Sequence, residues 1–233
     1  FFYQKALKNS RKIIAVSHFM KKKFLKITKL FFLKDKIVVQ YSPISSNLFF
    51  EEKEGSFKKN LNINDNTITL LSVSRIEEKK GYIEKLKIFS KLLETDLNYK
   101  WLIVGTGSFL NQLKKEVVKR NLEDYVIFVG EVSRVKLRYY YSNVDVFWLL
   151  SNFQESFGLV YVEAQACGCP VIGYNKYGVR EAIKNNVSGF LVENHDQVLQ
   201  ILRNRSFRRL DYNQIKKNAN NFNVKHNFIN LLI

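Results

Sequence analysis

The sequence predicts an α/β protein built on a doubly wound, Rossmann-like parallel sheet. From residue 67 onward, short apolar runs alternate strictly with segments rich in helix formers. The runs are continuous, which is typical of strands that helices cover on both faces. The expected strands are 68–74, 100–105, 125–130, 144–150, 170–174 and 189–193, and the expected helices are 80–94, 108–121, 133–142, 156–167 and 178–184. Strands and helices that alternate in this way indicate a single parallel sheet.

Three further segments flank this domain, which we bound at residues 67–205. Residues 1–44 predict one βα unit, in which Ser17 caps a basic amphipathic helix between two short strands. Residues 45–66 are polar, and we interpret them as a linker or a long loop. Residues 206–233 predict a last, C-terminal amphipathic helix.

The composition predicts a globular protein that lies in the cytoplasm. The chain has 233 residues, of which 46% are apolar, so it can bury a full-sized core. No apolar run reaches the roughly 18 to 20 residues that span a bilayer. Cys167 and Cys169 are one residue apart, a spacing that strains a disulfide, and we expect both to be small buried residues.

The net charge of +17 fits three kinds of partner: nucleic acid, an anionic membrane or an anionic ligand. The basic residues are scattered over several expected helices, which favours solvated faces over one nucleic-acid footprint. Peripheral association with an anionic membrane, at its inner face, stays compatible with this charge, whereas nucleic acid is disfavoured.

The stretch 151–170 organises the expected site. An apolar strand ends at Ser151, a polar loop with Glu155 follows, and a helix is expected from Ser156, with Glu163 on its second turn. The N-terminus of a helix offers unpaired N–H groups and about half a positive charge, which suits the phosphates of a nucleotide. Since both carboxylates can accept hydrogen bonds from hydroxyls, we interpret this stretch as the floor of a nucleotide-sugar site.

A second loop, at residues 74–81, follows the first strand of the domain. Arg75 and Lys80 lie at the carboxyl end of this strand, and two cations there could clamp a diphosphate. Alternatively, the two cations simply neutralise Glu77 and Glu78. The residues leave both readings open.

Other motifs exclude several classes of enzyme. Gly105 and Gly107 begin like a dinucleotide fingerprint, but Leu110 stands where the third glycine belongs, which argues against a nicotinamide dehydrogenase. The spacing still indicates a close approach of the backbone to some ligand. P-loop, metal-binding and nucleophile motifs are absent from the sequence, so we expect no metal and no cofactor. We interpret Glu181, in the segment GVRE, as a surface residue.

These loops resemble the C-terminal, donor-binding half of retaining GT-B glycosyltransferases of family 4 (group 1). ESFGLVYVE, at 155–163, is similar to the family's E-x7-E pattern, and EAQACGCPV continues it. SRIEEKKG, at 74–81, is similar to the family's G-R-x-x-x-x-K-G. The family's G-x-G, F-x-G-x-V and G-x-x-E fall at 105–107, 128–132 and 178–181. Ser74 and Leu150 depart from the family pattern without removing a group that contacts ligand.

The resemblance implies a metal-independent transferase that moves a sugar from a UDP- or GDP-linked donor to an acceptor with retention. Arg75 and Lys80 would stabilise the leaving diphosphate, and Glu155 would bind the hydroxyls of the sugar. The other donor-binding residues that it implies are Gly105 and Gly107, Glu131 and Val132 beside the nucleobase, Ser156, Phe157, Gly158 and Leu159 around the sugar and distal phosphate, and Glu163 on the ribose. Residues 1–44 would be the closing βα unit of an otherwise missing N-terminal acceptor domain, and the chain alone could be inactive.

Two alternatives remain beside this interpretation. One is a GT-B-type sugar-nucleotide epimerase, which shares the fold but not the E-x7-E helix. The other is a non-catalytic basic module that binds sugar nucleotides or nucleic acid. A nucleic-acid-binding protein would not need the E-x7-E pattern together with the R-x-x-x-x-K pattern. The two patterns therefore distinguish a glycosyltransferase donor domain from a nucleic-acid-binding module.

Overall fold

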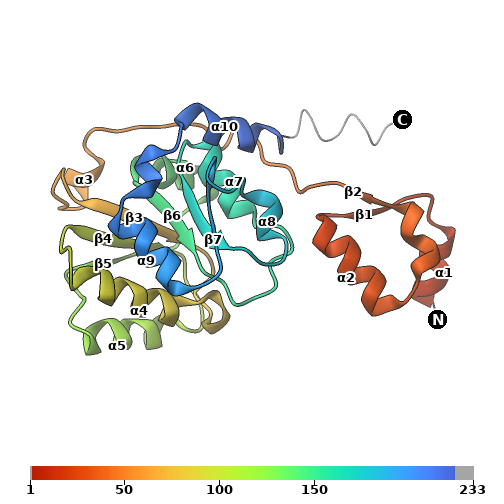
Figure 1. The fold of residues 1–233 in the computed structure, drawn as a ribbon, viewed down its shortest axis with the longest axis horizontal. Coiled ribbons are helices and arrows are strands. Elements are labelled where there is room, and N and C mark those ends of the chain that lie inside the picture. Colours follow the sequence, from red (N-terminus) through yellow and green to blue (C-terminus); the bar gives the residue numbers. More distant parts are fainter. Residues whose placement is uncertain (1, 224–233) are drawn as a thin grey trace.

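The computed structural model describes residues 2–223, which form two α/β units of unequal size (Figure 1). The larger unit holds six strands, all parallel, in the order β5-β4-β3-β6-β7-β8. The chain thus begins the sheet at its centre, builds one half, and returns to build the other, which is the doubly wound order of Rossmann-type sheets. The predicted fold class is confirmed.

Every strand and helix that we expected between residues 67 and 193 is present. The strands are β3 (Ile68–Val73), β4 (Tyr99–Val104), β5 (Val126–Gly130), β6 (Val146–Leu149), β7 (Val171–Tyr174) and β8 (Gly189–Val192). The α-helices are α4 (Tyr82–Leu93), α5 (Leu110–Lys119), α6 (Arg134–Asn143), α7 (Leu159–Ala166), α8 (Val179–Ala182), α9 (His195–Arg203) and α10 (Tyr212–Asn220), and the 3-10 helices are η2 (Glu78–Lys80) and η3 (Ser206–Arg209). The helix expected within 206–233 corresponds to α10, and residues 224–233 lie outside the described part of the chain.

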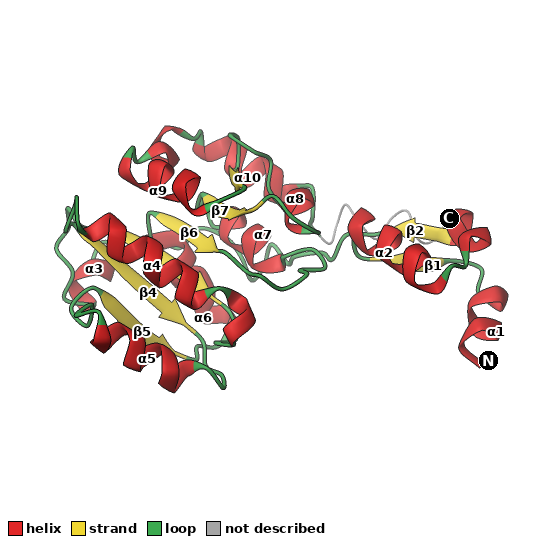
Figure 2. Ribbon diagram, turned by 60° about the horizontal axis from the view of Figure 1, so that its bottom comes forward, coloured by secondary structure: helices red, strands yellow, loops and turns green. Residues whose placement is uncertain are grey.

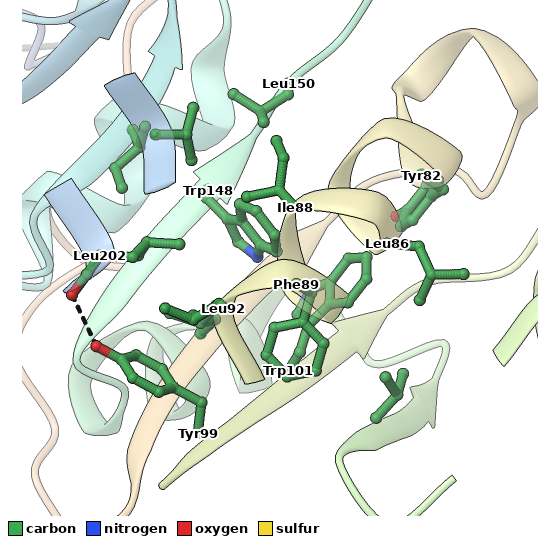
Figure 3. Packing of buried hydrophobic residues seen from close by; sticks show 14 of the residues in the cluster. Tyr82, Leu86, Ile88, Phe89, Leu92, Tyr99, Trp101, Trp148, Leu150 and Leu202 are labelled. Carbon is green, nitrogen blue, oxygen red and sulfur yellow. Dashed lines mark hydrogen bonds between the residues drawn. The ribbon is translucent and has the colours of Figure 1, made fainter. Parts of the chain in front are cut away.

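Helices cover both faces of the large sheet, which explains its continuous apolar strands. On one face, α4, α5 and α9 pack over Trp101 and Trp148, whose ring centroids lie 5.1 Å apart (Figure 3). The Tyr99 hydroxyl donates to the carbonyl of Leu202 at 2.8 Å and ties β4 to α9. On the other face, α6, α7, α8 and α10 bury a second cluster that includes both cysteines, which are free as expected.

One charged residue lies in the middle of the first face. Lys85 of α4 is fully buried, and its Nζ lies 3.1 Å from the Ser72 hydroxyl and 3.9 Å from the centre of the Tyr82 ring. Ser72 also accepts from the Trp101 indole and donates to the carbonyl of Trp148. Burial holds the pKa of Lys85 well below its ordinary value, and the neighbouring Lys80 lowers it further.

Residues 45–66 pack against the domain along much of their length. The stretch contains the short helix α3 (Phe57–Asn60), and Phe49, Phe57 and Ile63 are buried in the second cluster. Interpreting the stretch as a loop was correct, but it is not a free linker. Its polar composition concealed these three anchors because they are widely spaced in the sequence.

The smaller unit contains α1 (Phe2–Asn9), β1 (Ile13–Ala15), α2 (His18–Thr28), η1 (Phe31–Lys36) and β2 (Ile37–Val39). Its two strands are parallel, and the chain leaves β2 to reach the larger unit (Figure 2). The Ser17 hydroxyl accepts from the N–H of Met20 at 3.0 Å, so the predicted N-cap of α2 is confirmed. Among the described residues, no helix combines the length and apolar character that crossing a bilayer requires.

Candidate functional site

The candidate site lies at the carboxyl ends of β3 and β6, where the winding of the sheet reverses. These two strands are neighbours at the centre of the sheet, but their connections run to opposite sides of it. Ligands of doubly wound sheets bind in the crevice that this reversal opens. The loops at 74–81 and 150–158 therefore meet where the sequence placed its strongest motifs.

A cavity of about 340 Å³ opens between these two loops. Both units contribute to it, because Val16 and Ser42 of the N-terminal segment join its wall. Its lining also includes Ser74, Arg75, Lys80, Phe153, Glu155, Ser156, Phe157, Gly158 and Leu159. Seven of the predicted site residues thus face one space, and Phe153 is a lining residue that the sequence analysis missed.

Lys80 and Glu155 form an ion pair in this cavity. The Lys80 Nζ lies 2.6 Å from Glu155 Oε1, and their side chains are only 13% and 15% exposed. The two loops are also joined through the backbone, because the N–H of Asn152 donates to the carbonyl of Lys79. Gly81 permits this approach, since a Cβ there would lie 1.8 Å from the carbonyl oxygen of Leu150. The pair is therefore held in place by the packing of the two loops, with one cation and one carboxylate at the wall of the cavity.

Arg75 is the more exposed of the two predicted cations. Its side chain is 76% exposed, and its guanidinium contacts Glu77 at 2.8 Å. The alternative that the two cations neutralise Glu77 and Glu78 therefore holds in part, because Arg75 pairs with Glu77. Lys80 instead pairs with Glu155 of the other loop. Arg75 nevertheless lines the main cavity, so a rotation about its side-chain bonds would bring the guanidinium to a ligand there.

A second, smaller cavity of about 180 Å³ lies beside the first. The two share Val73, Ser74 and Arg75, and the smaller one is also lined by Gly105, Glu131 and Val132. Gly105, Glu131 and Val132, which we predicted as donor-binding residues, therefore line a cavity that adjoins the one beside Lys80 and Glu155. Gly107 lines neither cavity.

The G-x-G spacing has a structural reason inside the protein. At Gly105 a Cβ would lie 2.1 Å from the carbonyl oxygen of Ser74, and at Gly107 it would lie 2.4 Å from that of Ile76. Both glycines have positive φ and let the loop after β4 pack against the loop after β3. The close backbone approach is thus made to a neighbouring loop, although Gly105 also borders the smaller cavity.

Helix α7 begins at Leu159, three residues later than expected. Gly158 has φ of 94°, a left-handed conformation that interrupts the helix and turns the chain into it. Ser156 and Phe157 consequently belong to the loop, where they line the main cavity. The helix start still points its first N–H groups at this edge of the sheet.

Glu163 lies outside both cavities and is almost fully buried. Arg134 donates to its Oε1 at 3.0 Å, and the hydroxyl of Tyr141 lies 3.4 Å from its Oε2. Burial raises its pKa, and the guanidinium of Arg134 opposes that rise. Neither cavity reaches the carboxylate that we predicted to bind ribose. The sequence analysis did not identify Arg134 as its partner.

Glu181 joins the two units beside the site. Its carboxylate accepts from the N–H groups of His18 and Phe19, both at 2.8 Å, at the start of α2. The Ser17 hydroxyl also donates to the carbonyl of Ser156 at 2.5 Å. Because Ser156 lines the main cavity, the contact between the two units extends to the cavity wall. Our interpretation of Glu181 as a surface residue was incomplete: the side chain is half-buried and holds the start of α2, more than 160 residues away in the sequence.

We expect Glu181→Ala to weaken the contact between the larger unit and the start of α2. Removing a carboxylate that caps a helix costs about 0.5 to 2 kcal/mol, so amide hydrogens at the start of α2 should exchange faster, while those of β3 stay protected. Glu193→Ala is the control, because the Glu193 carboxylate accepts from the side chain of Asn175 and has no bond to α2. Unchanged exchange in α2 would show that the other contacts hold the units together without Glu181.

Within residues 2–223, no three His, Cys, Asp or Glu side chains gather as metal ligands would. The charges that the cavity offers a ligand therefore come from Arg75, Lys80 and Glu155.

Comparison with known proteins identifies the class and then the family. The fold is that of GT-B glycosyltransferases. A glycosyltransferase from Rickettsia africae has a TM-score of 0.81 and 25% identity, with 99% of this chain and 65% of that chain covered. Anabaena HepE in complex with UDP and glucose has a TM-score of 0.81 and 19% identity over 98% of this chain and 64% of that chain. The chain belongs to the family "glycosyl transferases group 1", which matches residues 53–222.

Two curated relatives are similar to this chain over part of their length. The chain is 31% identical to N-acetyl-alpha-D-glucosaminyl L-malate synthase of Bacillus anthracis over 175 residues, which are 72% of this chain and 45% of that protein. It is 31% identical to alpha-monoglucosyldiacylglycerol synthase of Streptococcus pneumoniae over 60% of this chain and 32% of that protein. The chain thus spans about half the length, or less, of these relatives.

Proposed function

We propose that this chain carries the donor site of a glycosyltransferase that transfers a sugar from a UDP- or GDP-linked donor with retention of configuration and without a metal ion. The observation that carries the proposal is the Lys80–Glu155 pair, which faces the cavity at the switch point of the sheet. The complex of Anabaena HepE with UDP and glucose supports the class of donor. Retention follows from the resemblance of the E-x7-E segment to the retaining enzymes of the family.

In this proposal the two cavities divide the donor between them. The larger one takes the sugar and diphosphate beside Lys80 and Glu155, and the smaller one takes the nucleoside beside Glu131 and Val132. When the bond between sugar and diphosphate breaks, negative charge develops on the departing phosphate. Lys80, Arg75 and the start of α7 lie where they would stabilise that charge, and a cation that is fixed in advance lowers the barrier most.

We expect Arg75→Ala to weaken the binding of UDP or GDP. A charge-assisted hydrogen bond contributes roughly 1.5 to 3 kcal/mol, and the lower end is expected because Arg75 must first leave Glu77. Isothermal titration calorimetry measures this change, with Arg120→Ala as the control, since Arg120 pairs with Glu116 on α5. An affinity that is unchanged in Arg75→Ala would remove Arg75 from the diphosphate site.

A thermal-shift panel with UDP, GDP, their sugars and a DNA duplex tests the proposed function as a whole. We expect one nucleotide and its sugars to raise the melting temperature, because a ligand that binds only the folded state stabilises it. Stabilisation by the duplex alone would favour the nucleic-acid-binding alternative and overturn the proposal.

A further inference from the structure

Phe153 is a half-exposed phenylalanine in the loop between β6 and α7. Its side chain is 42% exposed, and it lines the main cavity. The residues beside it, Asn152 and Gln154, are polar, and neither lines that cavity. Single exposed apolar residues are ordinary on protein surfaces, but among the exposed large apolar residues of the described chain, Phe153 is the one at the main cavity. A ligand that fills the cavity would therefore meet this side chain.

The backbone of Phe153 is held by the contacts that join the two loops of the site. Its N–H donates to the carbonyl of Lys79 at 3.2 Å and lies 3.1 Å from the hydroxyl oxygen of Ser151. Its carbonyl accepts from the N–H of Glu155 at 2.9 Å. The side chain of Phe153 therefore starts from an anchored position beside the carboxylate that we propose for the sugar.

Two ammonium groups lie near the ring of Phe153. The Nζ of Lys79 is 4.6 Å from the ring centre, and the Nζ of Lys80 is 5.4 Å from it. Both distances allow the attraction between a cation and an aromatic ring. Because Lys80 also pairs with Glu155 at 2.6 Å, the ring, the cation and the carboxylate are neighbours at one wall of the cavity. The exposed fraction of Phe153 shows that the two lysines leave part of the ring open to a ligand.

The shape of a sugar suits an aromatic ring that lies close to a carboxylate. A pyranose directs most of its hydroxyls around its edge and presents C–H groups on its faces. A carboxylate accepts hydrogen bonds from the hydroxyls at the edge, whereas an aromatic ring packs against a face and removes it from water. A diphosphate has no such apolar face. A nucleobase has one, but Phe153 does not line the smaller cavity that we propose for the nucleoside.

We propose that Phe153 contacts the donor sugar and packs its ring against a face of the pyranose whose hydroxyls Glu155 binds. This inference rests on the proposed donor site and adds to it a residue that selects for the sugar. Phe153 then contributes to the affinity for a sugar nucleotide and contributes nothing to the affinity for the free nucleotide.

Calorimetric titration with UDP, GDP, UDP-glucose, UDP-N-acetylglucosamine and GDP-mannose tests this inference. We expect Phe153→Ala to weaken the binding of a sugar nucleotide about tenfold, which corresponds to about 1.4 kcal/mol, and to leave the affinity for the free nucleotide unchanged. Phe153→Trp keeps an aromatic face and should retain the affinity for the sugar nucleotide. Phe153→Leu is apolar but has no ring, so it should lose most of that affinity.

Phe50→Ala is the matched control. Phe50 is 41% exposed, its ring centre lies 4.3 Å from the guanidinium carbon of Arg138, and it lines neither cavity. This substitution should change no affinity. If Phe153→Ala weakened the free nucleotide and the sugar nucleotide equally, the ring would act only through Lys80. That result, or unchanged affinity for both ligands, would overturn the role of Phe153 and leave the donor site standing, whereas no binding of any of these ligands to the unsubstituted protein would overturn both.

Discussion

Glu155→Ala should reduce sugar transfer by roughly 100- to 1,000-fold, the loss that follows removal of one group positioned for the transition state. The carboxylate lies 2.6 Å from Lys80 in the main cavity and is only 15% exposed, so no neighbouring solvent can replace its contacts with a sugar. Transfer to an acceptor, or hydrolysis of the donor when no acceptor is present, provides the measurement. Glu193→Ala should retain full activity, because Glu193 lines neither cavity.

Binding of free UDP or GDP to the same variant separates the proposed roles of the two partners. If Glu155 serves the sugar, its removal leaves the affinity for the nucleotide unchanged or increases it, because Lys80 loses a competing carboxylate. Glu155→Gln should give an intermediate rate, since the amide retains one acceptor oxygen. A loss of nucleotide affinity as large as the loss of transfer would place Glu155 on the phosphates instead. The melting temperature of each variant shows whether the folded state persists.

The sequence predicted the architecture well because the signals for it are local. Strands such as 68–73 are short, continuous apolar runs, and every residue of this strand is buried. The loops that follow the central strands could also be placed, because parallel strands bring their carboxyl ends to one edge. Arg75, Lys80 and Glu155 therefore meet in one cavity although 80 residues separate the first from the last.

The predictions that were incomplete depended on contacts between distant segments. Glu181 looked like a surface residue because nothing near it in the sequence indicates that it holds the start of α2. In the same way, a buried Glu163 beside Arg134 is indistinguishable in sequence from an exposed one. Helix α7 starts later than expected because Gly158 adopts positive φ, at a position where a Cβ would lie 2.7 Å from the Tyr161 ring. Helical propensity alone cannot indicate that choice.

Lys85 was the least predictable feature, because a lysine in an amphipathic pattern is normally assigned to the solvated face. Its position in α4 instead points into the core, above Ser72 and beside the Tyr82 ring. The carboxylate of Glu84 favours its charged form, but burial and the charge of Lys80 act in the opposite direction and prevail. The residue therefore destabilises the folded state at neutral pH.

Lys85→Met should make the protein more stable at neutral pH. Each unit by which the pKa of Lys85 lies below its ordinary value lowers the free energy of unfolding by about 1.4 kcal/mol, once the pH is below the pKa of the folded state. Methionine fills a similar volume without a charge. The Ser72 hydroxyl keeps its bonds to Trp101 and Trp148, so the substitution leaves no unpaired group there. For a chain of this length, each kcal/mol raises the melting temperature by about 2 to 4 °C.

The pH dependence of this difference identifies its cause. As pH falls below about 10.4, the ordinary pKa of lysine, Lys85 of the unfolded chain binds a proton. Lys85 of the folded chain binds its proton only at a lower pH, because its pKa is lowered. Between these two pH values the wild-type protein therefore loses stability as pH falls. The advantage of Lys85→Met in urea unfolding should therefore be largest at neutral pH and shrink toward pH 10, because other titrating groups are common to both proteins. Lys87→Met, on the exposed side of the same helix, should show neither effect. An advantage that stays constant with pH would mean that Lys85 titrates alike in the folded and unfolded chains and that packing alone accounts for the gain.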